Sequence, residues 1–300
     1  IAPGGLGAID LVGGIAVGEV NAKIESILDE LVSLPSLPST LVRINQMLDD
    51  PESRLPDIGK VIAQDPSLSL KALRLVNSAF YGLREKANSV ERAIILLGIK
   101  PTRNLVMTAS VFETLRCGEQ QLIRHSLAAA TGARLLAKHM GPGSPFADAE
   151  EAFMYGLLHD VGKIVMRQFL PKEWEAVLPA VTNGISAHQA EQKEMGIDHA
   201  ELGAILAERW KLADGLIMAI KGHHEISRCD NEDHRKRAAA IGITDWMCYE
   251  AGYPALEGAM AGVDDSVWTA AGLTPESVAP VVQQLRESDA TVNEMVSLAA

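Results

Sequence analysis

Residues 153–166 read FMYGLLHDVGKIVM, an almost entirely apolar stretch in which His159 and Asp160 stand side by side. Its apolar residues predict a buried helix, and we expect one continuous helix over residues 147–168. A carboxylate and an imidazole in such surroundings need compensation by a partner, a proton or a metal ion. Taken alone, the two residues fit a hydrogen-bonded His-Asp pair in the core as well as they fit a metal site.

Apolar residues recur at helical spacing on both sides of this stretch, and no segment shows the two-residue period of a strand. Longer helices are expected at residues 120–140, 174–183, 199–210, 214–224 and 236–251, with further helices after residue 254. Shorter helices are expected at residues 24–31, 41–48, 58–62, 68–78, 90–97 and 102–115. Ser89 is expected to cap one of them and Gly98 to end it. The predicted fold class is all-α, with an N-terminal bundle of short helices packed on a domain of longer helices.

The expected boundary between these two parts is Cys117-Gly118-Glu119. Residues 1–21 are rich in glycine and lack the basic start of a signal peptide, so we expect a linker or disordered lead-in. Residues 22–116 are expected to form the N-terminal helical subdomain, and residues 117–300 the second helical domain with the C-terminal helices.

The composition argues against several classes of function. A net charge of −12 without a stripe of Lys and Arg argues against a nucleic-acid-binding surface, and the short basic cluster at residues 234–237 is expected to be a solvated helix start. No apolar run approaches the roughly 18–20 residues that span a bilayer. Three irregularly spaced cysteines, with no C-x-x-C pair, indicate a reducing compartment. We therefore expect a cytoplasmic protein that binds neither nucleic acid nor membranes, in an oligomeric state that the sequence leaves open.

Five histidines and two aspartates, mostly in apolar surroundings on predicted helices, share the setting of the central His-Asp pair. They are His125, His159, Asp160, His199, His223, His224 and Asp245. Imidazole and carboxylate ligands in this number suit two divalent ions of the borderline class, such as Fe, Mn, Zn or Ni. Two such ions about 3.5–4 Å apart polarise a phosphate and activate water. The remaining histidines, His139, His188 and His234, lie in or beside polar segments and are expected at the surface.

The order His…His-Asp…His…His-His…Asp, with HDVGK at residues 159–163, resembles the HD superfamily of metal-dependent phosphohydrolases, and in particular its HD-GYP branch. The resemblance implies an HD-like helical domain in which the seven residues above are metal ligands. It also implies that Asp160 and Lys163 are catalytic, with Lys163 meeting the phosphate of a substrate.

The chain departs from the HD-GYP branch at two places. Gln121 stands one helical turn before His125, where that branch has a further carboxylate, and a charged segment follows His224 in place of the Gly-Tyr-Pro motif. A later Gly252-Tyr253-Pro254 is interpreted as a coincidence. These departures weigh against a third metal ion and against hydrolysis of cyclic dinucleotides.

Three stretches of the first half are similar in combination to HDOD domains, although each alone reads as ordinary helix punctuation. They are LPSLPSTLVRINQMLDDPE at residues 34–52, IAQDPSLSLKALRLVNSAFYG at 62–82 and SVERAIILLGIKPTRNLV at 89–106. Together with the second half, the resemblance covers roughly residues 22–250.

The resemblance to HDOD proteins implies a bacterial signal-transduction or regulatory module with a di-metal His/Asp site and little or no catalysis. Its partner is expected to be a signalling protein or a phosphorylated small molecule. Two alternatives stay open. The complete set of ligands also fits an active metal-dependent phosphohydrolase, either a phosphodiesterase or a nucleotide phosphatase. A vestigial site, in which the histidines form a polar network in the core, is the other alternative.

Overall fold

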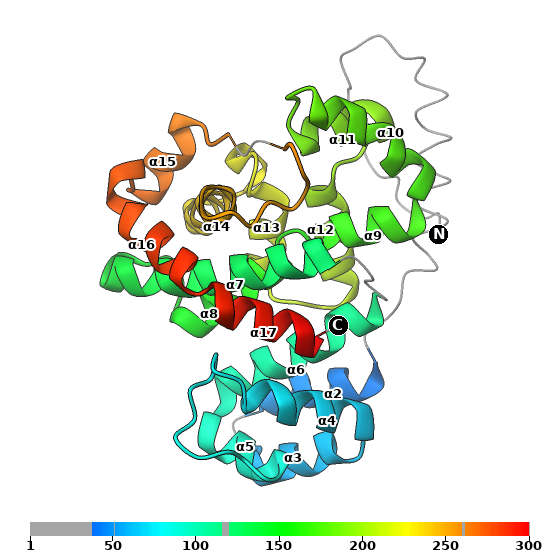
Figure 1. Ribbon diagram of the computed structural model, residues 1–300, viewed down its shortest axis with the longest axis vertical. Coiled ribbons are helices and arrows are strands. Elements are labelled where there is room, and N and C mark those ends of the chain that lie inside the picture. Colours follow the sequence, from blue (N-terminus) through cyan, green and yellow to red (C-terminus); the bar gives the residue numbers. More distant parts are fainter. Residues whose placement is uncertain (1–37, 51, 116–119, 260–261, 300) are drawn as a thin grey trace, which may run out of the picture.

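The computed structural model describes residues 38–50, 52–115, 120–259 and 262–299, and every regular element within them is a helix (Figure 1). The predicted all-α class is confirmed. The first part contains α2 (Ser39–Asp49), α3 (Leu55–Ala63), α4 (Pro66–Val76), α5 (Val90–Leu97) and α6 (Ile99–Thr114). The second contains α7 (Gln120–Met140), α8 (Ala149–Leu158), α9 (Val161–Phe169), α10 (Pro171–Thr182), α11 (Ala187–Met195), α12 (His199–Arg209), α13 (Asp214–Gly222) and α14 (Glu232–Ala251). It continues with α15 (Asp265–Ala271), α16 (Pro275–Glu287) and α17 (Asp289–Ala299), and 3-10 turns occur at Gly141–Gly143 and Ile226–Arg228.

Three predictions fall outside the described residues: the lead-in at 1–21, the helix at 24–31 and the boundary at 117–119. The other short helices are found within a few residues of their predicted positions. Ser89 caps α5 by accepting a hydrogen bond from the Arg92 N–H at 3.2 Å. Gly98 ends α5 with a φ of 83°, which glycine adopts at no steric cost.

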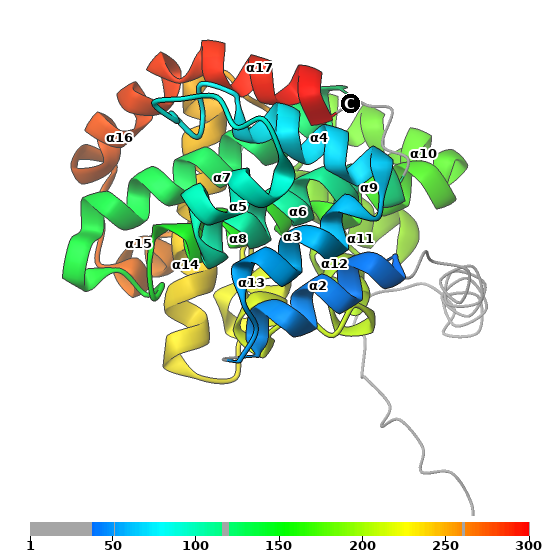
Figure 2. The ribbon, with the colours of Figure 1, turned by 90° about the horizontal axis from the view of Figure 1, so that it is seen from below.

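Helices α2–α5 lie at one end of the molecule and α7–α16 at the other, with α6 and α17 between them (Figure 1). Helix α6 packs on α8, and the C-terminal helix α17 packs on α4, α6 and α7. Figure 2 shows α17 alongside α4 from a second direction. The last helix of the chain therefore contacts both groups of helices.

The long helix predicted over residues 147–168 is instead two helices, α8 and α9, which meet at a bend at Asp160 (φ −101°, ψ 14°). Each half uses a glycine to approach a different neighbour. A Cβ on Gly156 would lie 2.3 Å from the Ala129 carbonyl oxygen of α7, and one on Gly162 would lie 1.9 Å from the His199 carbonyl oxygen of α12. Apolar periodicity cannot reveal such a bend, because residues 152–166, on both sides of it, are all buried.

Two further differences concern polar segments. Helix α11 was not predicted, because its sequence AHQAEQKEM carries few apolar residues. Helix α14 starts at Glu232, four residues earlier than predicted, because Asn231 caps it by accepting a hydrogen bond from the His234 N–H at 2.8 Å. Of the described helices, none combines the length and apolar character that crossing a membrane requires.

The close packing of α8 on α7 gives a stability prediction. We expect Gly156→Ala to lower the free energy of unfolding by at least about 1–3 kcal/mol, because its Cβ would meet backbone rather than a movable side chain. Thermal unfolding followed by circular dichroism measures the loss. Gly143→Ala is the matched control, since a Cβ at Gly143 meets nothing within 4 Å. Equal melting temperatures for both variants would contradict the observed packing.

Candidate metal centre

The structure brings all seven predicted metal-ligand candidates into one cluster. His125 lies on α7 and Asp245 on α14, while His159 and Asp160 lie at the bend between α8 and α9. His199 is the first residue of α12, and His223 and His224 directly follow α13. Six of the seven are buried, and His224 is half-buried.

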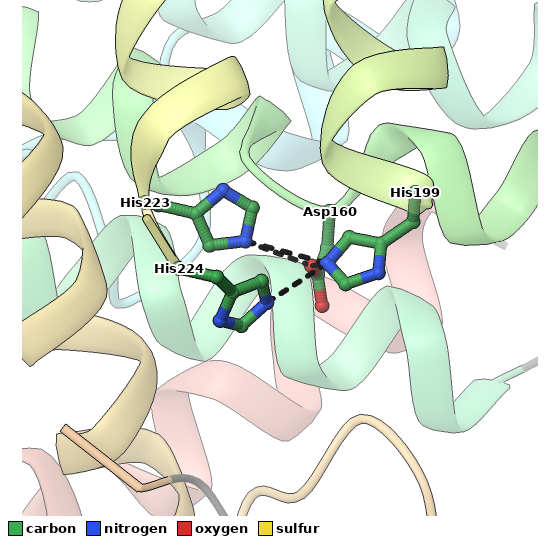
Figure 3. Close-up of side chains that lie close together, drawn as sticks. All are labelled: Asp160, His199, His223 and His224. Carbon is green, nitrogen blue, oxygen red and sulfur yellow. Dashed lines mark hydrogen bonds and ion pairs between the residues drawn. The ribbon is translucent and has the colours of Figure 1, made fainter. Parts of the chain in front are cut away.

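The cluster has two halves that share Asp160, and in each half the possible ligand atoms lie within 4.8 Å of one another. The α12–α13 half comprises Asp160, His199, His223 and His224 (Figure 3). The α7–α14 half comprises His125, His159, Asp160 and Asp245. Asp160 Oδ1 lies 3.2 Å from His199 Nε2, and Asp160 Oδ2 lies 3.3 Å from His125 Nε2. One carboxylate therefore faces both halves.

Backbone carbonyls orient three of the histidines. His125 Nδ1 lies 2.7 Å from the Tyr253 carbonyl oxygen, His159 Nδ1 lies 2.8 Å from that of Gly156, and His223 Nδ1 lies 2.7 Å from that of Ile220. Because a carbonyl oxygen only accepts hydrogen bonds, each of these Nδ1 atoms carries a proton and donates it. The Nε2 atoms of all three rings consequently point into the cluster.

Apart from the Lys163 ammonium, the inward-facing atoms are imidazole nitrogens and carboxylate oxygens, which are possible metal ligands. His125 Nε2 lies 3.3 Å from His159 Nε2 and 3.2 Å from Asp245 Oδ1. His199 Nε2 lies 3.0 Å from His224 Nε2 and 3.4 Å from His223 Nε2. A proton on one nitrogen can form a hydrogen bond to one neighbouring atom only, whereas a cation at the centre of each half could be bound by all the ligand atoms of that half.

Two carboxylate oxygens support the same conclusion. Asp160 Oδ1 and Asp245 Oδ1 are buried, and the groups that lie beside them are imidazole nitrogens: His199 Nε2 lies 3.2 Å from Asp160 Oδ1, and His125 Nε2 lies 3.2 Å from Asp245 Oδ1. Such buried carboxylate oxygens are costly unless protons or a cation compensate them. Imidazole nitrogens with carboxylate oxygens are ligands that borderline divalent ions accept, so the residues present fit a metal ion.

The electrostatics show how the cluster balances charge through protons. Burial alone lowers the pKa of His125, but its hydrogen bonds to Asp160 and Asp245 outweigh burial and raise that pKa to about 9. Burial lowers the pKa of His223 to about 4 and that of His224 well below its usual value, so both rings are neutral at pH 7. A metal ion bound here would therefore displace protons from some rings and meet free lone pairs on others.

The pKa values of both carboxyls show the same balance. Burial raises the pKa of Asp160, yet the neighbouring His159 and Lys163 hold it well below its usual range. Burial likewise raises the pKa of Asp245, and hydrogen bonds from His125 and His159 lower it further than burial raises it. Both carboxyls are ionised at neutral pH and provide negative charge for a cation.

Lys163, predicted to meet a phosphate, is 1% exposed and points into the cluster. Its Nζ donates a hydrogen bond to Asp160 Oδ2 at 2.6 Å. Burial lowers the pKa of Lys163, but the charge of Asp160 reverses this and raises the pKa above its usual value. The ammonium is thus charged and already paired.

Sequence reasoning missed two residues of α11. Glu191 is fully buried, and its Oε2 accepts hydrogen bonds from the His199 backbone N–H at 2.8 Å and from His199 Nδ1 at 2.6 Å. His188, predicted at the surface, is half-buried and stacks on His224 with ring centroids 4.4 Å apart. Their spacing of three residues places both on one helix face, but α11 itself was not recognised.

One other prediction is corrected and one agrees with the structure. His234, expected at the surface, is 8% exposed because it packs at the first turn of α14 and pairs with Asp230 at 2.6 Å. Tyr253, whose motif was interpreted as a coincidence, orients His125 through its carbonyl oxygen, and Gln121 Nε2 donates to the next carbonyl, that of Pro254, at 3.3 Å. His139 is exposed, as expected.

A cavity of about 310 Å³ lies beside the start of α7, between α10 and residues 255–257. Gln121, Trp174 and Leu178 are among its lining residues, and none of the seven clustered residues lines it. The cluster itself is covered by protein on most sides.

A family model described as the HDOD domain matches residues 34–226 of the chain. The fold is similar to an HDOD domain protein of unknown function from Geobacter sulfurreducens, with a TM-score of 0.76, 24% identity, and coverage of 94% of this chain and 98% of that one. It is also similar to a Marinobacter aquaeolei protein provisionally named a signal transduction protein, with a TM-score of 0.77, 23% identity, and coverage of 94% and 66%. A Shewanella amazonensis protein provisionally named a phosphohydrolase has a TM-score of 0.69, 23% identity, and coverage of 91% and 97%. At these identities the likeness shows the fold.

Among curated proteins, an uncharacterized protein of Treponema pallidum is 29% identical over 211 residues. These are 69% of this chain and 40% of that protein, so the chain spans less than half the length of this relative.

The geometry of the cluster predicts that a chelator lowers the melting temperature. Ligand binding to the native state alone stabilises by about 2.7 kcal/mol when free metal is about a hundredfold above its dissociation constant. For a chain of this size the shift is about 5 °C or more.

Asp160→Ala removes the carboxylate shared by both halves and should lose most bound metal and most of the chelator response, as read by elemental analysis and thermal unfolding. His139→Ala, at an exposed position, is the control. The same chelator response in Asp160→Ala as in the wild type, with no metal in either, would leave a polar core network as the explanation.

Proposed function

The chain belongs to the HDOD domain family, and we propose that it is a bacterial signal-transduction module whose His/Asp cluster binds divalent transition-metal ions with little or no catalysis. The residues that would hold two ions are His125, His159, Asp160, His199, His223, His224 and Asp245. Fe, Mn, Zn and Ni suit this donor set. When bound, the ions supply positive charge against the two aspartates and Lewis acidity toward a phosphate.

The observation that supports metal binding is the convergence of possible ligand atoms. The Nε2 atoms of the clustered rings face one another at 3.0–3.4 Å around the buried carboxylates of Asp160 and Asp245. A vestigial polar network would instead pair each acceptor with a donor, because unpaired buried polar atoms destabilise the fold.

The observation that supports weak catalysis is the position of Lys163. A lysine that binds the phosphate of a substrate has to present its ammonium group to the space that the substrate enters. Here the ammonium is buried and donates to Asp160 Oδ2 at 2.6 Å, so reaching a phosphate requires breaking a buried ion pair. Breaking such a pair costs about 3–5 kcal/mol when one partner is left alone.

The segment after His224 also supports weak catalysis. Residues 226–228 form a 3-10 turn, and Arg228 pairs with Asp198, the N-cap of α12, at 2.7 Å. The turn is therefore held against α12, next to the cluster, by an ion pair with a buried carboxylate. A charged segment held in this way does not provide a substrate-binding loop.

The alternative is an active phosphohydrolase, acting on a phosphodiester or a nucleotide. The complete set of seven residues, Asp160 included, favours it, since a module without catalysis does not need every ligand. In that case, Lys163 would leave Asp160 when a phosphate enters.

The proposed partner is a signalling protein or a phosphorylated small molecule. Exposed apolar side chains occur together at the α5–α6 junction, where Ile95, Leu96 and Ile99 are each more than two-fifths exposed. Such side chains at the surface of a small helical bundle suit contact with another protein.

The paired lysine predicts slow or undetectable hydrolysis. With Mn²⁺ or Fe²⁺ present, turnover of cyclic dinucleotides and of bis(p-nitrophenyl) phosphate should stay within about threefold of that of Asp160→Asn, because the Lys163 ammonium is paired with Asp160 and does not meet the phosphate. A threefold difference in rate is smaller than the tenfold change that about 1.4 kcal/mol in the activation barrier produces. Product formation by chromatography and absorbance measures it. Metal-dependent turnover that is at least tenfold above the Asp160→Asn background would favour the phosphohydrolase instead.

A further inference from the structure

We infer that the cluster takes up two divalent ions in a fixed order, the α12–α13 half first and the α7–α14 half second. The inference rests on the proposed metal binding and concerns the regulation of the same site. Its basis is that the two halves, although similar in their ligands, are supported differently by the residues behind them.

The α12–α13 half is ready for a cation. Asp160 Oδ1 faces His199 Nε2 at 3.2 Å and His223 Nε2 at 3.7 Å, whereas the Lys163 ammonium pairs with the other oxygen, Oδ2. His224, the third histidine of this half, is held by its stack on His188. No other side chain has to leave this half before an ion binds.

Glu191 strengthens this half as a positioning residue behind His199. Its Oε2 accepts hydrogen bonds from His199 Nδ1 at 2.6 Å and from the backbone N–H of the same residue at 2.8 Å. A carboxylate behind a histidine ligand fixes the ring and makes its inward nitrogen more basic. By contrast, the Nδ1 atoms of His125, His159 and His223 in the cluster donate to neutral backbone carbonyls.

The α7–α14 half is not ready in the same way, because the Lys163 ammonium already pairs with the Asp160 oxygen that faces this half. The Lys163 ammonium donates to Asp160 Oδ2 at 2.6 Å, and Oδ2 is the oxygen that faces His125 at 3.3 Å and His159 at 3.6 Å. A cation in this half either displaces the ammonium or lies beside it. Like charges that share one buried oxygen repel each other strongly.

Charge balance leads to the same order. With the ligand rings neutral, as metal binding requires, the three buried carboxylates Asp160, Asp245 and Glu191 and the ammonium of Lys163 give a formal charge of −2. One divalent ion neutralises this charge, whereas a second leaves an excess of +2 in a mostly buried site. Uncompensated buried charge is costly, so the second ion binds more weakly than the first.

The experiment is a calorimetric titration of the metal-free full chain with Mn²⁺, together with electron paramagnetic resonance. We expect two steps whose dissociation constants differ at least about tenfold, which is one step of about 1.4 kcal/mol. A signal of isolated Mn²⁺ should appear first and a spin-coupled pair second. Asp245→Asn should keep the first step and lose the second.

Two further variants test the reasons for the order. Glu191→Gln should weaken the first step by about 10–100-fold, the usual effect of losing a carboxylate behind a metal-binding histidine. It should also shift the visible spectrum of the Co²⁺-loaded protein, a readout that a purely structural role would not change. Lys163→Met should strengthen the second step and bring it closer to the first. Glu175→Gln and Lys172→Met, at exposed positions on α10, are the matched controls.

The possible results separate the inference from the proposed function. Two equal steps, loss of the first step in Asp245→Asn, or a Glu191→Gln titration like that of its control would each overturn the inference while metal binding stands. No Mn²⁺ binding by the wild type would instead remove the proposed metal site. If Lys163→Met does not fold, as judged by circular dichroism, Asp245→Asn and Glu191→Gln still decide the order.

Discussion

The buried carboxylate of Asp160 is the interaction on which the rest of the site depends. One oxygen faces the histidines of α12 and α13, and the other faces those of α7 and of the bend while accepting a hydrogen bond from Lys163. A buried charge of this kind persists only when the surrounding groups compensate it. The helices that carry those groups are far apart in the sequence, so the compensation links α7, α9, α12, α13 and α14.

The bend between α8 and α9 is what allows this arrangement. In one straight helix, His159 and Asp160 would diverge by about 100°. At the bend, the backbone of Asp160 leaves helical geometry, and both side chains reach the same cluster. Gly162 then allows the start of α12 to approach to a distance that a Cβ would prevent, which places His199 beside Asp160.

The residues behind the cluster give its two halves different characters. Glu191 and His188 support the α12–α13 half from α11, whereas Lys163 is paired within the α7–α14 half. The same lysine thus bears both on the proposed weak catalysis and on the proposed order of metal uptake.

The all-α class and the seven clustered residues could be predicted from the sequence, because helical periodicity and the mostly apolar sequence neighbours of these His and Asp residues are local properties of the chain. Helix α11, and with it Glu191, could not, because a polar helix acquires its buried face only from the neighbours on which it packs. The bend at Asp160, the carbonyl of Tyr253 behind His125 and the pairing of Lys163 also depend on contacts between distant segments. The sequence by itself thus determined which side chains are available for the site. The tertiary structure alone decided how they are oriented and charged, because both depend on atoms that other helices place around them.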